Sequence, residues 1–126
     1  WGLPVLGEMV PGGFNSDPES RGAEAIALAA RLGAELGADF IKAPYCDDYG
    51  TVTSSTFVPV VILGGAKGDE RLMLSNIHAA IAAGARGVAI GRNVFQCDDP
   101  AAMTRSIVAI VHENASVEDA LSILQG

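Results

Sequence analysis

Apolar residues recur along the chain in two alternating arrangements, which are short continuous runs and longer stretches with helical spacing. The continuous runs predict strands of a parallel sheet, because strands covered on both faces are almost wholly apolar. The predicted strands span residues 3–9, 40–43, 58–63 and 87–90. The stretches with helical spacing span residues 17–36, 69–83 and 100–111, and short helical turns are expected within 46–56 and 93–96. This succession is typical of β/α units joined by right-handed crossovers.

Capping residues predict where the helices begin and end. Asp17 is the expected N-cap of the first helix, with Pro18 at its first helical position and Gly37 after its last turn. Ser116 is the expected N-cap of a terminal helical segment. The buried face of the first helix is expected to consist of Ile26, Ala29, Ala30, Leu32, Gly33 and Leu36.

Two architectures fit four β/α units in 126 residues. One is half of a (β/α)8 barrel, because a whole barrel typically needs about 250 residues. The other is a doubly wound sheet of the flavodoxin type, which can form a complete domain at this size. The chain starts with Trp1 and has no initiator Met, so we expect it to be part of a longer protein.

Composition and charge narrow the classes of partner. The net charge of −7 argues against nucleic acid and against an anionic membrane, because no basic stripe is available to replace counterions. A local positive pocket for an anionic small molecule remains compatible with this charge. Cys46 and Cys97 lack the spacing of a metal site or a disulfide framework, which predicts reduced thiols in a cytoplasmic protein. The sequence predicts no metal and no other cofactor.

Lys42 is the strongest candidate for chemistry. It is one of only two lysines, and it lies at the C-terminal end of an apolar strand, where catalytic side chains gather in parallel barrels. Burial removes hydration from an ammonium group and so favours the free amine. A free amine can attack a carbonyl and form an iminium that accepts electrons from a breaking C–C bond. The alternative is a structural lysine paired with a carboxylate such as Glu8.

Two glycine turns predict a phosphate site. Gly64 and Gly65 follow the third predicted strand, and Gly91 and Arg92 follow the fourth. Glycine lets backbone N–H groups approach a ligand closely, and the loops after the last two strands form the recurrent phosphate site of (β/α)8 barrels. The alternative is that these glycines only make tight turns.

Other side chains are weaker candidates. Glu8 ends the first predicted strand as a possible acid or base, and Tyr45 follows the lysine, where substrate contact and simple packing remain equal alternatives. His78 lies in the middle of a predicted helix and His112 near the C-terminus of another, and both are expected to be structural.

Three segments resemble the archaeal-type class I fructose-bisphosphate aldolases. They are residues 34–42 (Ala-Glu-Leu-Gly-Ala-Asp-Phe-Ile-Lys), 60–65 (Val-Val-Ile-Leu-Gly-Gly) and 91–96 (Gly-Arg-Asn-Val-Phe-Gln). The same superfamily contains the aminodideoxyheptulosonate synthases and the thiolase that degrades phosphorylated autoinducer-2. The resemblance implies that residues 1–126 are one partial domain, the C-terminal half of the barrel with strands five to eight, whose N-terminal half is missing. It also implies a homo-oligomer.

The family's functional residues fall on named positions of this chain. The resemblance places the Schiff-base lysine at Lys42 and the phosphate-binding turns at 64–65 and 91–92. The aldolases and heptulosonate synthases carry an acid/base tyrosine before a proline, but here Val10 precedes Pro11. Valine cannot transfer a proton, so either Glu8 or Tyr45 replaces the tyrosine or the reaction differs.

Three functions therefore remain open. The leading hypothesis is a lyase, a Schiff-base aldolase acting on a phosphorylated ketose. The second is acyl transfer from a phosphorylated diketone to coenzyme A through the same lysine. The third is a phosphate-binding half-barrel that has no activity alone.

Overall fold

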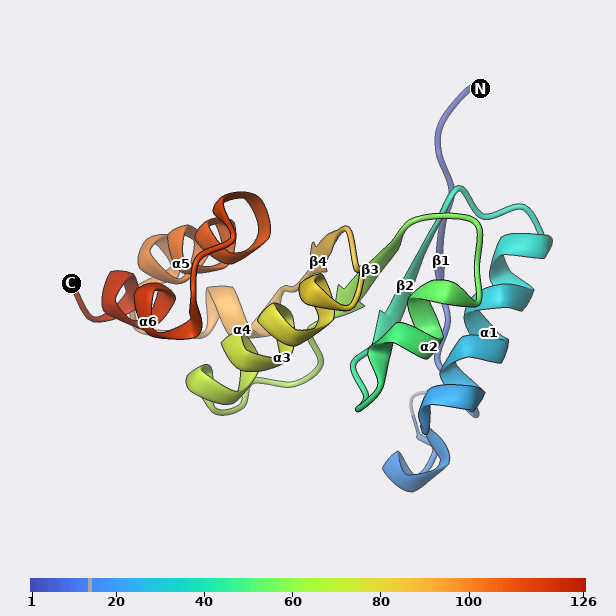
Figure 1. Ribbon diagram of the computed structural model, residues 1–126, viewed down its shortest axis with the longest axis horizontal. Helices are drawn as coiled ribbons and strands as arrows, with labels where there is room; N and C mark the ends of the chain where they lie inside the picture. The colour runs from blue at the N-terminus through green and yellow to red at the C-terminus, as the bar shows by residue number, and fades with distance from the viewer. Residues whose placement is uncertain (14) are drawn as a thin grey trace.

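A parallel four-stranded sheet forms the centre of the molecule in the computed structural model, which describes residues 1–13 and 15–126 (Figure 1). The strands are paired in chain order, β1-β2-β3-β4. Their bounds are Leu6–Glu8 for β1, Phe40–Pro44 for β2, Val60–Leu63 for β3 and Gly87–Ala89 for β4. A doubly wound sheet reverses its strand order at a switch point, and this sheet has no reversal. The predicted parallel β/α succession is confirmed, and the consecutive order favours the barrel type of connection.

The first strand is shorter than predicted. Residues 3–5 do not belong to it, because Asp39 takes the place of a strand partner there. The Val5 N–H donates to Asp39 Oδ2 at 2.7 Å, and the Val5 carbonyl accepts from the Asp39 N–H at 2.9 Å. Pro4 also has no N–H to contribute to a ladder. The strand prediction for residues 3–5 was therefore wrong.

The first long helix begins later than predicted. A 3-10 turn, η1 (Pro18–Ser20), precedes α1 (Ala23–Glu35), whose N-cap is Gly22. Asp17 caps the 3-10 turn instead, since its Oδ1 accepts from the Glu19 N–H at 3.0 Å. The N-cap prediction for Asp17 was wrong for this reason, whereas Gly37 follows the helix as predicted, with a φ of 102°.

Only part of the predicted apolar face of α1 is buried. Ile26 and Ala30 are fully covered, and a Cβ on Gly33 would come within 2.8 Å of the Ile41 side chain. Leu32 and Leu36 were predicted to be buried, but they are 49% and 86% exposed. They form an outward row with Leu28 at a spacing of four residues, because the sheet covers the opposite side of this helix.

The remaining helices confirm the predicted pattern. They are α2 (Tyr49–Ser54), α3 (Glu70–Ala82), α4 (Arg92–Phe95), α5 (Pro100–Glu113) and α6 (Val117–Gln125). Asp69 and Asp99 cap α3 and α5 through side-chain hydrogen bonds. Ser116 and Asp119 form a reciprocal capping box at the start of α6. Figure 1 shows α1 and α2 beside β1 and β2, with α5 and α6 at the opposite end of the molecule.

Burial alternates along the central strands and defines the two faces of the sheet. Ile41, Ala43, Val60 and Ile62 are at most 2% exposed and pack with the helices in one core. The residues between them are only partly buried. Because successive side chains point to opposite faces of a strand, Lys42 lies on the face opposite the core.

Candidate active site

Lys42 and Glu8 form the central pair of the candidate site. The register of β1 with β2 sets Glu8 directly beside Lys42, and the Met9 N–H extends the pairing by donating to the Lys42 carbonyl at 2.8 Å. The Lys42 Nζ lies 3.2 Å from Glu8 Oε2. The two side chains are 19% and 35% exposed, so the pair is partly desolvated yet open to a small molecule. An amine and a carboxylate at this distance can exchange a proton directly.

The loop after β3 is shaped by its glycines. Lys42 pairs with Val61, and Gly64 follows three residues later, so the loop begins about 10 Å farther along the strand direction. A Cβ on Gly64 would lie 2.8 Å from Ile90, and Gly65 has a φ of 66°. Neither position accepts a larger residue without rearrangement. The side of the loop at residues 65–68 is exposed.

The turn after β4 lies next to this loop. Gly91 is the N-cap of α4, and a Cβ there would lie 3.3 Å from the Phe95 ring. The Arg92 side chain is exposed and has no hydrogen bond or ion pair to another described residue. A guanidinium in that state can form a bidentate contact with an anion. The structure thus brings together the two predicted glycine turns.

Tyr45 lies apart from the Lys42–Glu8 pair. Its ring stacks on Tyr49 with centroids 5.7 Å apart, and no hydrogen bond joins it to either member of the pair in the described part of the chain. It lines a cavity of about 180 Å³ between the end of β3 and α3. Burial raises the pKa of the Tyr45 hydroxyl, and the charge of Asp47 and the nearby Cys46 raise it further. The phenol is therefore protonated at neutral pH.

Asn93 is a buried polar residue to which the sequence alone assigned no role. Its side chain is 5% exposed, donates to the carbonyls of Gly64 and Ala66, and accepts from the Gly68 N–H. The signal in the sequence was a polar amide directly after Gly91 and Arg92. It could not reveal the role of Asn93, because the partners of this side chain lie 25 to 29 residues earlier in the chain. The pairing of β3 with β4 brings them together.

Several other predicted residues lie away from these groups. His78 is in the middle of α3 and His112 is in the last turn of α5, as predicted from their helical positions. Cys46 and Cys97 are free thiols. Within residues 1–13 and 15–126, no three His, Cys, Asp or Glu side chains gather in a way that would hold a metal ion.

Among the described helices, none has both the length and the apolar character needed to cross a membrane.

Known proteins similar to this chain include a synthase and a thiolase. A 2-amino-3,7-dideoxy-D-threo-hept-6-ulosonate synthase of Archaeoglobus fulgidus is 41% identical over 121 residues, covering 96% of this chain and 45% of that protein. A 3-hydroxy-5-phosphonooxypentane-2,4-dione thiolase of Salmonella typhimurium is 39% identical over 123 residues, covering 97% of this chain and 41% of that protein. The chain therefore spans less than half the length of these relatives.

The fold also matches solved aldolase structures. One is an archaeal fructose-1,6-bisphosphate aldolase whose catalytic lysine is covalently bound to the carbinolamine intermediate of its substrate. It superposes with a TM-score of 0.75 at 34% identity, covering 86% of this chain and 45% of that chain. The model of the DeoC/LacD family aldolases matches residues 1–97, which is most of the sequence. On this basis the chain belongs to the DeoC/LacD family of aldolases.

Proposed function

We propose that this chain carries the Schiff-base machinery of a class I aldolase that acts on a phosphorylated ketose, as fructose-bisphosphate aldolase does. The observation that carries the proposal is the 3.2 Å pair of Lys42 and Glu8 on the open face of the sheet, where the last residue of β1 pairs with the middle residue of β2. Family membership and the covalently bound lysine of the archaeal structure support it. The proposal includes the whole protein being a (β/α)8 barrel that forms homo-oligomers, with residues 1–126 as its C-terminal half, strands five to eight.

Each group has a role in the proposed reaction. Glu8 takes a proton from the Lys42 ammonium, and the free amine adds to the substrate carbonyl to give a carbinolamine. Loss of water forms an iminium on Nζ. A base removes the proton of the hydroxyl that becomes the aldehyde, the C–C bond breaks, and its electron pair moves into the iminium to give an enamine. Protonation of the enamine and hydrolysis return the lysine and release the second product.

Glu8 is the proposed acid and base, because it is the carboxylate in contact with the nucleophile. Tyr45 is the second candidate for proton transfer, since its phenol is protonated and follows the same strand. It stacks on Tyr49 instead of facing Lys42, so it would have to reorient to reach the substrate.

Phosphate binding is assigned to the two glycine turns. Gly64, Gly65 and Gly91 let the backbone come close to the phosphate. Arg92 supplies a positive charge, and its side chain has no other partner among the described residues. The loop begins about 10 Å beyond the strand partner of Lys42, which suits a substrate whose phosphate lies several bonds from its carbonyl. Binding energy at the phosphate then positions the carbonyl at the amine. The phosphonooxy group in the name of the thiolase relative supports an anionic substrate.

Borohydride trapping tests the nucleophile. Reduction of the full-length protein in the presence of fructose 1,6-bisphosphate is expected to leave a covalent adduct on Lys42, located by peptide mass spectrometry. Lys42→Arg keeps the charge and is expected to abolish the adduct, because a guanidinium is not a nucleophile at accessible pH. Arg105→Lys, at an exposed position of α5 outside the residues proposed to bind substrate, is the control and is expected to retain the adduct. An adduct elsewhere or none at all contradicts the proposal.

The second candidate is acyl transfer from a phosphorylated diketone to coenzyme A. Val10 favours it, because the chain lacks a tyrosine at the position where the aldolases place their proton-transfer group. The thiolase relative at 39% identity agrees with this alternative. Parallel assays with fructose 1,6-bisphosphate and with 3-hydroxy-5-phosphonooxypentane-2,4-dione plus coenzyme A separate the two. Turnover of the diketone alone would replace the aldolase proposal with acyl transfer.

A further inference from the structure

We propose that Asn93 is a positioning residue, which holds the loop 64–68 so that its backbone N–H groups face the phosphate of the substrate. This inference rests on the proposed function, since it concerns the same phosphate site. Asn93 lies in α4, the short helix after β4, while the loop follows β3. The inference thus concerns how one of the two turns is shaped by a side chain from the other.

The hydrogen bonds of Asn93 all go to this one loop. Its Nδ2 donates to the Gly64 carbonyl at 2.8 Å and to the Ala66 carbonyl at 3.1 Å. Its Oδ1 accepts from the Gly68 N–H at 3.1 Å. Both protons of the side-chain amide and its oxygen are therefore bonded to backbone groups within residues 64–68. A buried amide that satisfies three backbone groups fixes the conformation of that segment, because each group would lose its partner if the loop moved.

Planarity of the peptide unit extends this effect to the other side of the loop. The carbonyl and the next N–H of a trans peptide point in opposite directions, and no described peptide bond is cis. Because the Gly64 and Ala66 carbonyls point at Asn93, the N–H groups of Gly65 and Lys67 point away from it. Asn93 therefore turns two backbone donors outward from the interior of the loop.

Those donors are free to bind a ligand. The backbone N–H groups of Gly65, Ala66 and Lys67 donate no hydrogen bond to another described residue. The three residues are exposed. Consecutive backbone N–H groups without internal partners form an anion-binding concavity when the chain around them is held in place. Asn93 is the residue that provides this restraint from inside.

A second hydrogen bond, from the Lys67 side chain, holds the same loop on its exposed side. The Lys67 Nζ donates to the Gln96 carbonyl at 2.5 Å, at the end of the same short helix. The lysine charge thus remains beside the loop while the side chain bridges the two turns.

Aspartate cannot replace Asn93 in this arrangement, since a carboxylate has no proton for the Gly64 and Ala66 carbonyls. The identity of the amide, and not only its size, is therefore required.

Phosphate affinity and imine formation should respond differently to loss of this amide. We would measure the Kd of inorganic phosphate by calorimetry on the full-length protein, and separately the borohydride trapping of unphosphorylated dihydroxyacetone on Lys42. Asn93→Ala and Asn93→Asp are expected to raise the phosphate Kd about tenfold or more. Trapping of dihydroxyacetone should change by less than about twofold, because that substrate makes no phosphate contact. The KM for fructose 1,6-bisphosphate should rise more than kcat falls.

Asn76→Ala is the matched control, because Asn76 lines the same cavity as Asn93 and its side chain has no hydrogen bond to another described residue. This variant is expected to change neither the phosphate Kd nor the trapping of dihydroxyacetone. Equal loss of phosphate binding and of trapping would show a merely structural role and overturn the proposal. So would an unchanged Kd in the Asn93 variants, no phosphate binding by the wild type, or failure of both variants to fold. If the wild type traps no carbonyl compound, the aldolase proposal fails, while the phosphate comparison still decides the role of Asn93.

Discussion

Gly64 lies where the two proposed phosphate turns touch, and it permits a specific test of packing. A Cβ at this position would lie 2.8 Å from both Cγ atoms of Ile90. Gly64→Ala is expected to destabilise the fold by about 1–3 kcal/mol through overpacking, measured by urea denaturation. Ile90→Ala removes both Cγ atoms, so the double variant should lose less stability than the two single changes summed.

Gly68→Ala in the same loop is the control for that experiment. A Cβ at Gly68 meets no atom within 4 Å, so its effect is expected to stay within about 0.5 kcal/mol. Additive energies for Gly64→Ala and Ile90→Ala would contradict the contact.

Cys46 gives a prediction that depends on pH. Burial raises the pKa of its thiol, and the charges of Asp47 and Asp48 add to the increase. A raised pKa means that less of the thiol is thiolate at any pH near the transition, so alkylation should be slow at neutral pH. Its rate against pH should have a midpoint above that of a free cysteine. Asp47→Asn should lower the midpoint only partly, because burial is the larger cause. A midpoint at or below that of the free amino acid would contradict this.

The sequence named candidate residues for the site but could not supply their contacts. Lys42 could be singled out because a charged residue interrupts an apolar run, which is a local signal, although β2 continues to Pro44 and places Lys42 in the middle of the strand and not at its predicted end. Its contact with Glu8 was only one of two possibilities, since the partner lies 34 residues earlier and the strand register decides the pairing. The role of Asn93 could not be predicted, because its three hydrogen bonds depend on the packing of two loops.

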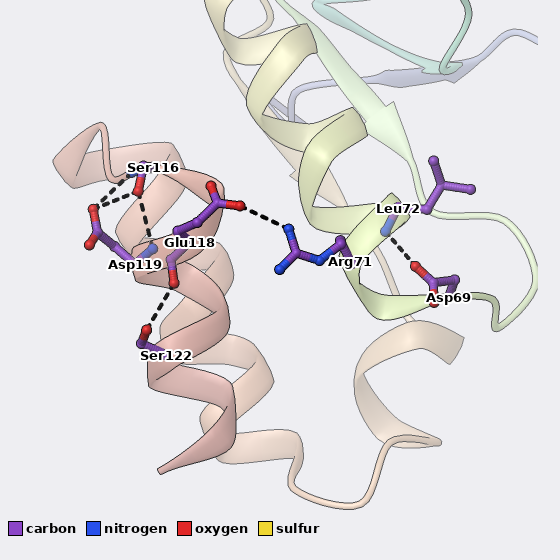
Figure 2. Close-up of polar contacts among 7 residues, drawn as sticks. All are labelled: Asp69, Arg71, Leu72, Ser116, Glu118, Asp119 and Ser122. Atoms are coloured by element: carbon purple, nitrogen blue, oxygen red, sulfur yellow. Dashed lines mark hydrogen bonds and ion pairs between the residues drawn. The ribbon is translucent and has the colours of Figure 1, made fainter.

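At the scale of elements, the α6 helix shows which contacts fix a helix to its neighbours. Figure 2 shows the capping box of Ser116 and Asp119 at its start and the Arg71–Glu118 ion pair that joins it to α3. The Arg71 hydrogen bond lowers the pKa of Glu118, but both side chains are more than half exposed, at 61% and 72%. Solvent and salt screen such a pair, so it should add little to stability.

The two kinds of contact in α6 can be compared directly. Ser116→Ala is expected to cost about 1 kcal/mol in urea denaturation, because the N–H of Asp119 loses its side-chain acceptor. Arg71→Ala should cost clearly less, and its effect should vanish in high salt. A larger loss from Arg71→Ala than from Ser116→Ala would show that the ion pair, and not the cap, fixes this helix.

The first residues of α1 and α6 depend on which backbone N–H groups the nearby capping side chains bind. Asp17 carries a good N-cap signal, yet its side chain closes a 3-10 turn two residues on, and α1 starts only at Ala23. The Ser116 signal succeeded because an acidic partner lies three residues later and completes a capping box. At Asp17 the single capping residue therefore marks a turn, while at Ser116 the reciprocal pair marks the helix start itself.

At the scale of the whole molecule, both outer strands have one free edge in the described part of the chain. β1 pairs only with β2, and β4 pairs only with β3. Unpaired parallel edges are sites for further pairing. The row of Leu28, Leu32 and Leu36, on the side of α1 that faces away from the sheet, adds exposed apolar surface. Scattered leucines are ordinary on a surface, but we expect a row of three together with two open strand edges to promote association.

These surfaces predict how the isolated 126-residue chain behaves in solution. Sedimentation velocity at several concentrations is expected to show reversible association. Association would pair the open edges of β1 and β4 and bury the α1 leucines, and both changes lower the free energy of the associated state relative to the monomer. Leu32→Lys with Leu36→Lys should weaken association, since both side chains are exposed and a charge there opposes burial. Arg105→Lys on the distant α5 helix keeps its charge and serves as the control. A chain that stays monomeric at every concentration and still forms the Lys42 adduct would contradict the proposed half-barrel, because no covering element would then be needed.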